Sequence, residues 1–198
     1  MRYTASNICQ NQGVVMPVVG DVRLSTVYGW PDTRTGTFEG SSPVIIPGVP
    51  LGNSPAKILK EYLVQNDIED MTDPADGLAW PLYVGYMPDG SKVKTDVASV
   101  YDTPGIKDGR EMSGEVAEFY GIQIKVRSRD YVEGFKKIQS LAASTEQIFR
   151  APVTVDGDNY LLQNVSRQGP VIPLGVEKGT GGRRLFTINL LLTIAKTE

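Results

Sequence analysis

Two stretches of this chain alternate apolar and polar residues with the period of two that a half-buried β-strand requires. They cover residues 120–129 and 186–194. Each leaves an apolar face that must be covered, so the chain has to build a sheet packed on one side by other elements. The apolar members are Tyr120, Ile122, Ile124 and Val126 in the first stretch, and Phe186, Ile188, Leu190, Leu192 and Ile194 in the second.

Two helices are predicted to cover this sheet. The first takes Asn53 or Ser54 as its cap and places Pro55, which lacks an N–H, at the first helical position. Its Lys60 is expected to face water. The second begins after the capping residue Asp130. The inward faces are Ile58, Leu59, Tyr62 and Leu63 in the first helix, and Tyr131, Phe135, Ile138, Ala142, Thr145 and Phe149 in the second.

The remaining elements complete a sheet. Further strands are predicted at residues 80–86, 93–101, 153–155 and 160–165. A turn at 102–105, a charged loop through Asp108, Arg110 and Glu111, and a loop rich in glycine and proline at 169–182 are expected to separate strands. The order predicts an α+β fold in which a largely antiparallel, mixed sheet is packed by two helices.

Residues 1–52 have a different character. Glycine and proline recur throughout, and only short β-prone runs such as 22–28 stand between them. We expect an N-terminal extension over residues 1–52, either an arm or a poorly ordered tail, and a folded domain over residues 53–198.

The inventory of side chains argues against catalysis. The chain has no histidine, and its one cysteine is Cys9, so neither a Ser–His–Asp nor a Cys–His site can form. The glycine-rich stretch 175–182 lacks the Gly-Lys-Ser/Thr ending of a phosphate-binding loop. We expect no enzyme activity, no cofactor and no metal site. The net charge of −3 gives no general attraction to nucleic acid, and neither a secretory signal nor a membrane-spanning run is expected.

Charged side chains gather in two places. Lys125, Arg127 and Arg129 alternate along one predicted strand and are expected to project together from its polar face. That face is either solvated or in contact with another subunit. Five acids follow the first helix and predict a solvated loop rather than a calcium site: Asp67, Glu69, Asp70, Asp73 and Asp76.

Several pieces of the sequence, taken in order, resemble a known family. They are the strand-and-turn pair Leu82–Asp89 and Val100–Gly105, the run Ile122–Tyr131 that enters a helix, and an ending of Leu174-Gly175, a glycine-rich loop, Arg183-Arg184 and a strand with Asn189 near its middle. Over residues 54–196 this succession resembles the tail terminator, or minor capsid, proteins of long-tailed bacteriophages. The N-terminal extension has no counterpart in the family, and Glu177 stands where the resemblance leads us to expect an aspartate.

The resemblance implies a structural virion protein without enzyme activity. Such a protein forms a ring, typically of six subunits, at the head-proximal end of the tail tube, and is assembled in the host cytoplasm. The ring stops tube polymerisation and offers a docking surface to the head connector. Its partners are therefore other copies of itself, the tail tube protein and connector proteins. DNA passes through without sequence-specific binding, and no membrane is involved.

Two sets of charged residues are candidate contacts. We expect Arg127 and Arg129 to meet the acidic loop of a neighbouring subunit. The candidate subunit interface is Lys125, Arg127, Arg129, Asp67, Glu69, Asp70 and Asp73; the candidate contact loop for tube or connector is Glu177, Lys178, Arg183 and Arg184.

Other functions stay open at this point. One is another neck or tail component, such as a head-completion protein or a tail tube subunit, and the latter would polymerise into long tubes. The other is a small non-enzymatic ligand-binding module that uses the loops around Asp102 and Gly175.

Overall fold

The computed structural model describes residues 50–77, 80–89, 94–110, 116–177 and 182–197, with the backbone alone for 108–110 and 116–117. The predicted extension up to residue 49, Cys9, Glu111 and Lys178 lie outside these residues. The elements are α1 (Pro55–Gln65), η1 (Ile68–Asp70), β1 (Met71–Thr72), η2 (Pro74–Asp76), β2 (Trp80–Val84), β3 (Val97–Arg110), β4 (Val116–Ser128), α2 (Tyr131–Thr145), β5 (Phe149–Val155), β6 (Asp158–Arg167), β7 (Ile172–Val176) and β8 (Arg184–Thr197).

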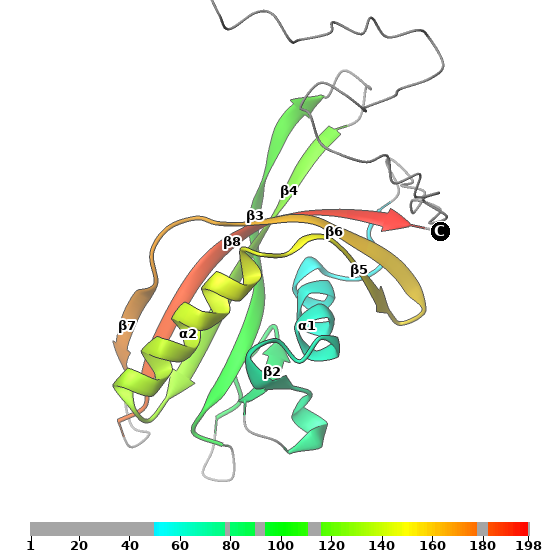
Figure 1. Cartoon of the computed structure of the whole chain (residues 1–198). Helices are drawn as coiled ribbons and strands as arrows, with labels where there is room; N and C mark the ends of the chain where they lie inside the picture. The colour runs from blue at the N-terminus through cyan, green and yellow to red at the C-terminus, as the bar shows by residue number, and fades with distance from the viewer. Residues whose placement is uncertain (1–49, 78–79, 90–93, 111–115, 178–181, 198) are drawn as a thin grey trace, which may run out of the picture. The chain divides into compact units, whose positions relative to one another are not determined.

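The strands form one mixed sheet in the order β1-β2-β3-β4-β8-β6-β5, and β7 also pairs with β8. The pairs β1–β2 and β2–β3 are parallel, and the others are antiparallel. Helices α1 and α2 lie on the same face of the sheet (Figure 1). The predicted α+β fold, a mostly antiparallel sheet covered by two helices, is confirmed.

The helix starts follow from capping. The Ser54 hydroxyl accepts a hydrogen bond from the backbone N–H of Lys57 at 3.2 Å, and Pro55 takes the first helical position. The Asp130 carboxylate accepts from the N–H groups of Val132 and Glu133 at 2.7 and 2.9 Å. Both predicted helix starts are therefore confirmed, and each satisfies N–H groups that have no partner inside the helix.

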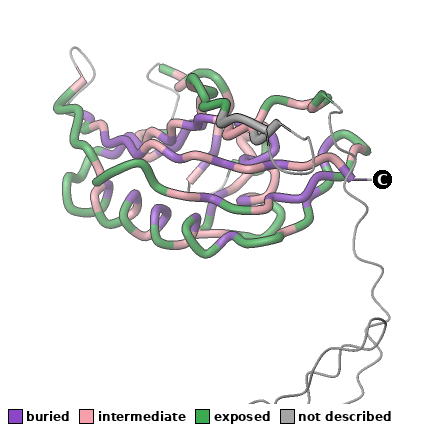
Figure 2. Tube along the Cα trace, turned by 90° about the horizontal axis from the view of Figure 1, so that it is seen from above, coloured by how far each residue is buried: buried purple, intermediate pink, exposed green. Residues whose placement is uncertain are grey.

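The core lies between the helices and the covered face of the sheet, where the buried residues gather (Figure 2). The alternation at 120–129 and 186–194 supplies its central part, because β4 and β8 are paired neighbours. The largest fully buried apolar side chains are Tyr160, Phe186, Ile58, Leu59, Leu63, Met71, Leu82, Ile122, Ile124, Ile138 and Leu141.

The predicted turn at 102–105 is wrong, because β3 continues through it to Arg110. The pairing with β4 shifts register between Thr103 and Ile106, so the chain forms an irregularity of the β-bulge type instead of turning. The strands approach so closely here that a Cβ on Gly105 would lie 2.1 Å from the Phe119 carbonyl oxygen. The predicted charged loop through Asp108 and Arg110 is strand for the same reason.

Three further expectations are corrected. The stretch 169–182 contains the strand β7, which pairs with β8. Phe149 does not extend the inward stripe of α2, since the helix ends at Thr145 and Ile148 takes the buried position, leaving Phe149 71% exposed. Lys60 is buried rather than solvated, because carboxylates reach its ammonium group.

Helix α2 approaches the sheet closely at Gly134. A Cβ at this position would lie 2.7 Å from a ring carbon of Phe186 and 2.8 Å from the Cβ of Ser128. The first contact involves a buried ring and the second an atom next to the backbone, so neither neighbour can move aside easily.

Replacing Gly134 with alanine is therefore expected to destabilise the protein. Overpacking costs about 1–3 kcal/mol, which exceeds the gain of roughly 1 kcal/mol in helix propensity. Urea denaturation measures the difference in the free energy of unfolding. The exposed control Gln139→Ala should change it by less than about 0.5 kcal/mol. A Gly134→Ala protein more stable than the wild type would show that the helix does not pack this tightly.

Candidate functional site

Four charged residues from distant parts of the sequence meet at one end of the sheet. Arg127 lies near the end of β4, Asp89 follows β2, and Glu177 and Arg183 flank the connection from β7 to β8. Nη1 of Arg127 lies 3.6 Å from a carboxylate oxygen of Glu177. Nη1 of Arg183 lies 3.0 Å from Asp89 and 3.9 Å from Glu177. We call Asp89, Arg127, Glu177 and Arg183 the charge cluster.

Arg127 is the buried centre of the charge cluster. Its side chain is fully buried, and its Nε and Nη1 have no hydrogen-bond partner among the described residues. Its Nη2 donates to the backbone oxygen of Lys94 at 3.5 Å. Burial and then the neighbouring Arg183 lower the pKa of Arg127, whereas Glu177 and Asp89 act to raise it. The carboxylates thus offset the cost of holding this cation away from water.

The prediction that Lys125, Arg127 and Arg129 project together from an exposed face is wrong for Arg127. Lys125 is half-buried, with its ammonium 4.6 Å from the centroid of the Tyr101 ring, and only Arg129 is exposed. Arg127 is covered because the start of β8 and the loops that follow β2 and β7 converge on it.

The charge cluster holds together the two ends of the connection between β7 and β8. The N–H of Glu177 donates to the carbonyl of Arg183 at 2.8 Å, next to the ion pairs of both side chains. Two of the predicted contact residues, Glu177 and Arg183, are therefore engaged inside the subunit. Arg184 is exposed, and its guanidinium lies 5.5 Å from the centroid of the Tyr131 ring.

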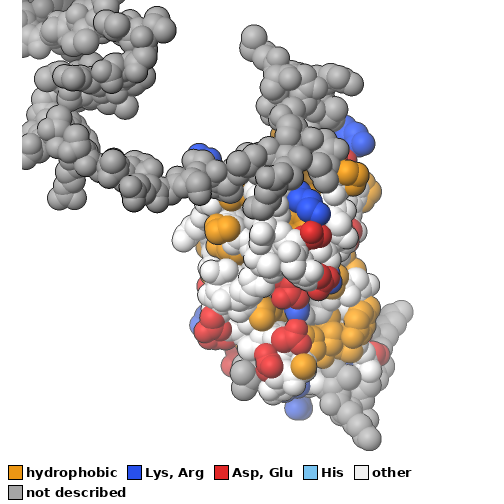
Figure 3. Space-filling model, turned by 90° about the vertical axis from the view of Figure 1, so that its right-hand side faces the viewer, with side chains coloured by type: hydrophobic (Ala, Val, Ile, Leu, Met, Phe, Trp, Pro, Cys, Tyr) orange, Lys and Arg blue, Asp and Glu red, His pale blue; other side chains and the backbone are white. Residues whose placement is uncertain are grey.

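The five predicted acids lie in a short irregular segment, residues 67–76, which we call the acidic segment. Asp67, Asp70 and Asp76 are exposed, whereas Glu69 and Asp73 are half-buried. Acidic side chains gather in the lower half of the face shown in Figure 3. The carboxylate of Glu69 accepts from the Ser144 hydroxyl at 2.8 Å, so the segment lies against the C-terminal half of α2.

Two lysines hold the acidic segment on the helices. Lys60 on α1 forms ion pairs with Asp73 and, at 2.9 Å, with Glu61. Lys137 on α2 donates to the backbone oxygen of Glu69 and lies 3.6 Å from Asp70. The predicted solvated loop is therefore tied to the domain.

These ion pairs also change the pKa values of Lys60 and Asp73. Burial alone would lower the pKa of Lys60, but the hydrogen bonds to Asp73 and Glu61 outweigh burial and raise it. The same bond from Lys60, followed by the backbone N–H of Ala75, lowers the pKa of Asp73.

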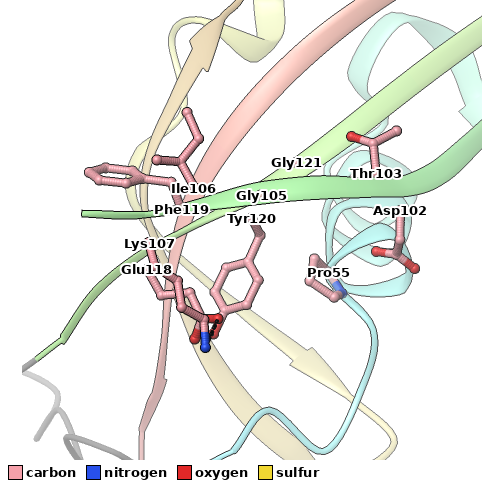
Figure 4. A pocket seen from close by; sticks show the side chains of 10 residues that line it. All are labelled: Pro55, Asp102, Thr103, Gly105, Ile106, Lys107, Glu118, Phe119, Tyr120 and Gly121. Atoms are coloured by element: carbon pink, nitrogen blue, oxygen red, sulfur yellow. Dashed lines mark hydrogen bonds and ion pairs between the residues drawn. The ribbon is translucent and has the colours of Figure 1, made fainter. Parts of the chain in front are cut away.

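A pocket of about 280 Å³ lies beside the bulge in β3 (Figure 4). Four of its polar side chains are already engaged within the subunit. Lys107 lies 3.5 Å from Glu118, the Tyr120 hydroxyl donates to Glu118 at 3.2 Å, and Asp102 accepts from the Ala56 N–H at 2.8 Å. Burial, and then Glu118, raise the pKa of Tyr120. This arrangement favours a structural role over acid–base chemistry.

Exposed apolar side chains gather at the free edge of β7. All five residues of β7 are exposed, and none carries a charge. The ring of Tyr131 at the start of α2 packs edge-on against Phe186 at 5.3 Å, and Phe186 pairs with Pro173 of β7. The helix start and the strand are therefore adjacent. We call their five exposed side chains, Tyr131, Val132, Ile172, Leu174 and Val176, the edge patch.

Across the described ranges, no group of three or more potential metal ligands converges. The helices within these ranges are also too short or too polar to cross a membrane.

Sequence reasoning missed Asp89, Lys60, Lys137 and the apolar edge of β7. The alternation of Ile172, Leu174 and Val176 was a visible signal for a strand inside the glycine- and proline-rich stretch. The pairing of Asp89 with Arg183 had no local signal, since 94 residues separate them.

The chain matches one protein-family model, described as bacteriophage tail terminator protein, over residues 59–196. No curated protein matches it. Among the solved structures that match, one aligns with 74% of this chain and 98% of its own length, at 14% sequence identity and a TM-score of 0.36. That similarity is too weak to bear on function.

Replacing Glu177 with glutamine tests the charge cluster. The change leaves the buried Arg127 without its nearest anion, which should lower the free energy of unfolding by about 3 kcal/mol. Denaturant unfolding measures the loss. The control Glu146→Gln disrupts a partly exposed pair with Arg167 at 3.2 Å and should cost less than about 1 kcal/mol. Equal losses in the two variants would contradict the role assigned to Glu177.

The Lys60–Asp73 pair predicts a pH dependence. Because the folded-state pKa of Asp73 is lowered, its stabilisation is complete above the ordinary carboxyl pKa of 3.8 and is lost as pH falls through the lowered value. Asp73→Asn should therefore be less stable than the wild type at about pH 6, and the difference should shrink towards about pH 2. Urea unfolding across this range measures it, and a difference independent of pH would contradict the assignment.

Proposed function

Because the chain belongs to the bacteriophage tail terminator family, we propose that it forms a ring that caps the head-proximal end of the tail tube. Family membership makes it a structural protein of the phage tail, carried in the virion, that contacts other tail and head proteins. In the proposed role the ring stops tube polymerisation and presents a docking surface to the head connector.

The observation that carries this proposal is the family match, which spans residues 59–196 and so covers nearly the whole described domain. Physical features support it. A ring of identical subunits needs two different surfaces on each subunit that fit one another head to tail. The edge patch offers one such surface, because an uncovered strand edge and clustered apolar side chains are typical of protein contacts.

The proposed ring domain is residues 53–198, with residues 1–52 as a separate N-terminal arm. The proposed ring has six subunits and lets DNA pass without sequence-specific contacts. A net charge of −3 is compatible with that passage, since phosphate-binding surfaces are strongly basic.

Native mass spectrometry over a range of concentrations, with negative-stain images of the same samples, tests the ring. We expect closed rings of one size. Addition of the protein to growing tubes of the phage's tail tube subunit should also halt their growth and leave a ring at one end. Open-ended tubes built from this chain alone would identify it as a tube subunit. A monomer at every concentration that leaves tube growth unchanged would exclude the terminator role.

A further inference from the structure

We propose that the edge patch of one subunit docks on the acidic segment of the next subunit, and that this contact closes the ring. The inference rests on the proposed function and names the surfaces that would carry it. It replaces the predicted contact of Arg127 with the acidic loop, since Arg127 is buried within the subunit.

The edge patch has the composition of an interface core. Tyr131, Val132, Ile172, Leu174 and Val176 are between 44% and 55% exposed. They are five of the eight large apolar side chains that are exposed among the described residues. The register places Val176 on the face of Phe186 and Ile172 on the opposite face, so the patch wraps around the free edge of β7. The concentration of the majority at this edge marks a contact surface, whereas single exposed apolar residues are normal.

The strand β7 lacks the charged side chains that often protect a sheet edge. Exposed edges are commonly protected by charged side chains, but the sequence of β7 is Ile-Pro-Leu-Gly-Val. Its protection is limited to Pro173, which removes an N–H group, and to the register shift between Pro173 and Gly175. β8 pairs with one side of β7, and no described strand pairs with the other.

Positive charge borders the patch. Arg129 and Arg184 are exposed at this end of the sheet, and the guanidinium of Arg184 lies over the Tyr131 ring. Among the acids on the same end of α2, Asp130 is engaged by two N–H groups of the helix. Glu133 is exposed, and Lys136 follows it one helical turn further on. With three cations (Arg129, Arg184 and Lys136) and two anions (Asp130 and Glu133), the border carries a net charge of +1.

The acidic segment complements this surface in charge and in apolar character. Asp67, Asp70 and Asp76 are exposed, and Lys137 is the one described cation in an ion pair with them, through Asp70. Asp70 keeps 82% of its side chain exposed in that pair and can meet a second cation. Ala75 and the half-buried Pro74 stand between the carboxylates and provide apolar surface.

The two surfaces lie at separate places on the domain, as a head-to-tail contact requires. The edge patch includes the first residues of α2, whereas Glu69 of the acidic segment is bonded to Ser144 near the last. Ser144 comes thirteen positions after Tyr131 in the helix, which is a rise of roughly 20 Å. In Figure 1, β7 lies on the left, and the acidic segment, drawn in teal, lies to the right below α1. Two separate surfaces of this kind can build a closed ring.

Charge reversal tests the contact. The variant Arg129→Glu/Arg184→Glu should assemble at least about a hundredfold more weakly than the wild type, because it places like charges in contact. The control Lys107→Glu/Arg150→Glu makes the same change in net charge at exposed residues elsewhere and should form wild-type rings. Adding Asp67→Lys and Asp76→Lys to the first variant should restore assembly. Melting temperatures establish that each variant is folded.

A cysteine pair gives a second readout that does not depend on charge. In a Cys9→Ser background, Val132→Cys with Ala75→Cys should yield a ladder of disulfide-linked oligomers on oxidation, up to the size of the ring. Phe149→Cys with Ala75→Cys, which places one thiol on an exposed residue of β5 outside the edge patch, should yield monomers.

The outcomes separate the two proposals. If the wild type forms rings and the Arg129→Glu/Arg184→Glu variant forms them equally well, this interface is overturned and the proposed function stays intact. The same holds if the wild type forms rings but the cysteine pair gives no disulfide ladder. Absence of any wild-type ring, both in solution and on tube ends, would overturn the proposed function and the interface with it.

Discussion

The rest of the domain depends on the pairing of β8. Its first half is bonded to β4 on one side and to β7 on the other, and its second half continues with β6. Phe186, Ile188 and Leu190 on its covered face form the layer on which α2 packs. One strand therefore joins the two parts of the sheet, supports a helix and holds the exposed edge strand. A slip of one residue would turn all these side chains to the wrong face.

The charge cluster fixes the end of this strand at an energetic cost. An isolated buried guanidinium is unfavourable, and apolar packing of similar volume is often at least as stable. We infer that the cluster favours one arrangement of the loops over others. Glu177 and Asp89 can pair with Arg127 and Arg183 only when the β7–β8 connection and the loop after β2 lie next to these arginines. The position of β7, and with it the edge patch, then depends on these ion pairs.

The sequence predicted the covered parts of the fold well. Alternation in β4 and β8 and the two helix caps, predicted at Asn53 or Ser54 and at Asp130, depend on local physics, and all four were confirmed, with Ser54 as the first cap. Two of the errors arose where contacts distant in sequence override local signals. The turn residues at 102–105 become a bulge because β4 continues alongside, and Arg127 is buried because the start of β8 and two loops converge on it. The family resemblance was confirmed by the family model. The subunit contacts stay predictions, since they involve neighbouring subunits and the structure contains one chain.

Hydrogen–deuterium exchange on the isolated subunit and on the ring bound to tube ends tests the central claim, that the edge of β7 is covered on assembly. The amides of residues 172 and 174–176 that point to the free edge, away from β8, should exchange fast in the subunit and at least about tenfold more slowly in the ring, while those of β4 should be slow in both. Equally fast exchange of the β7 amides in the two states would contradict the account, because the edge patch would then face solvent in the assembled tail.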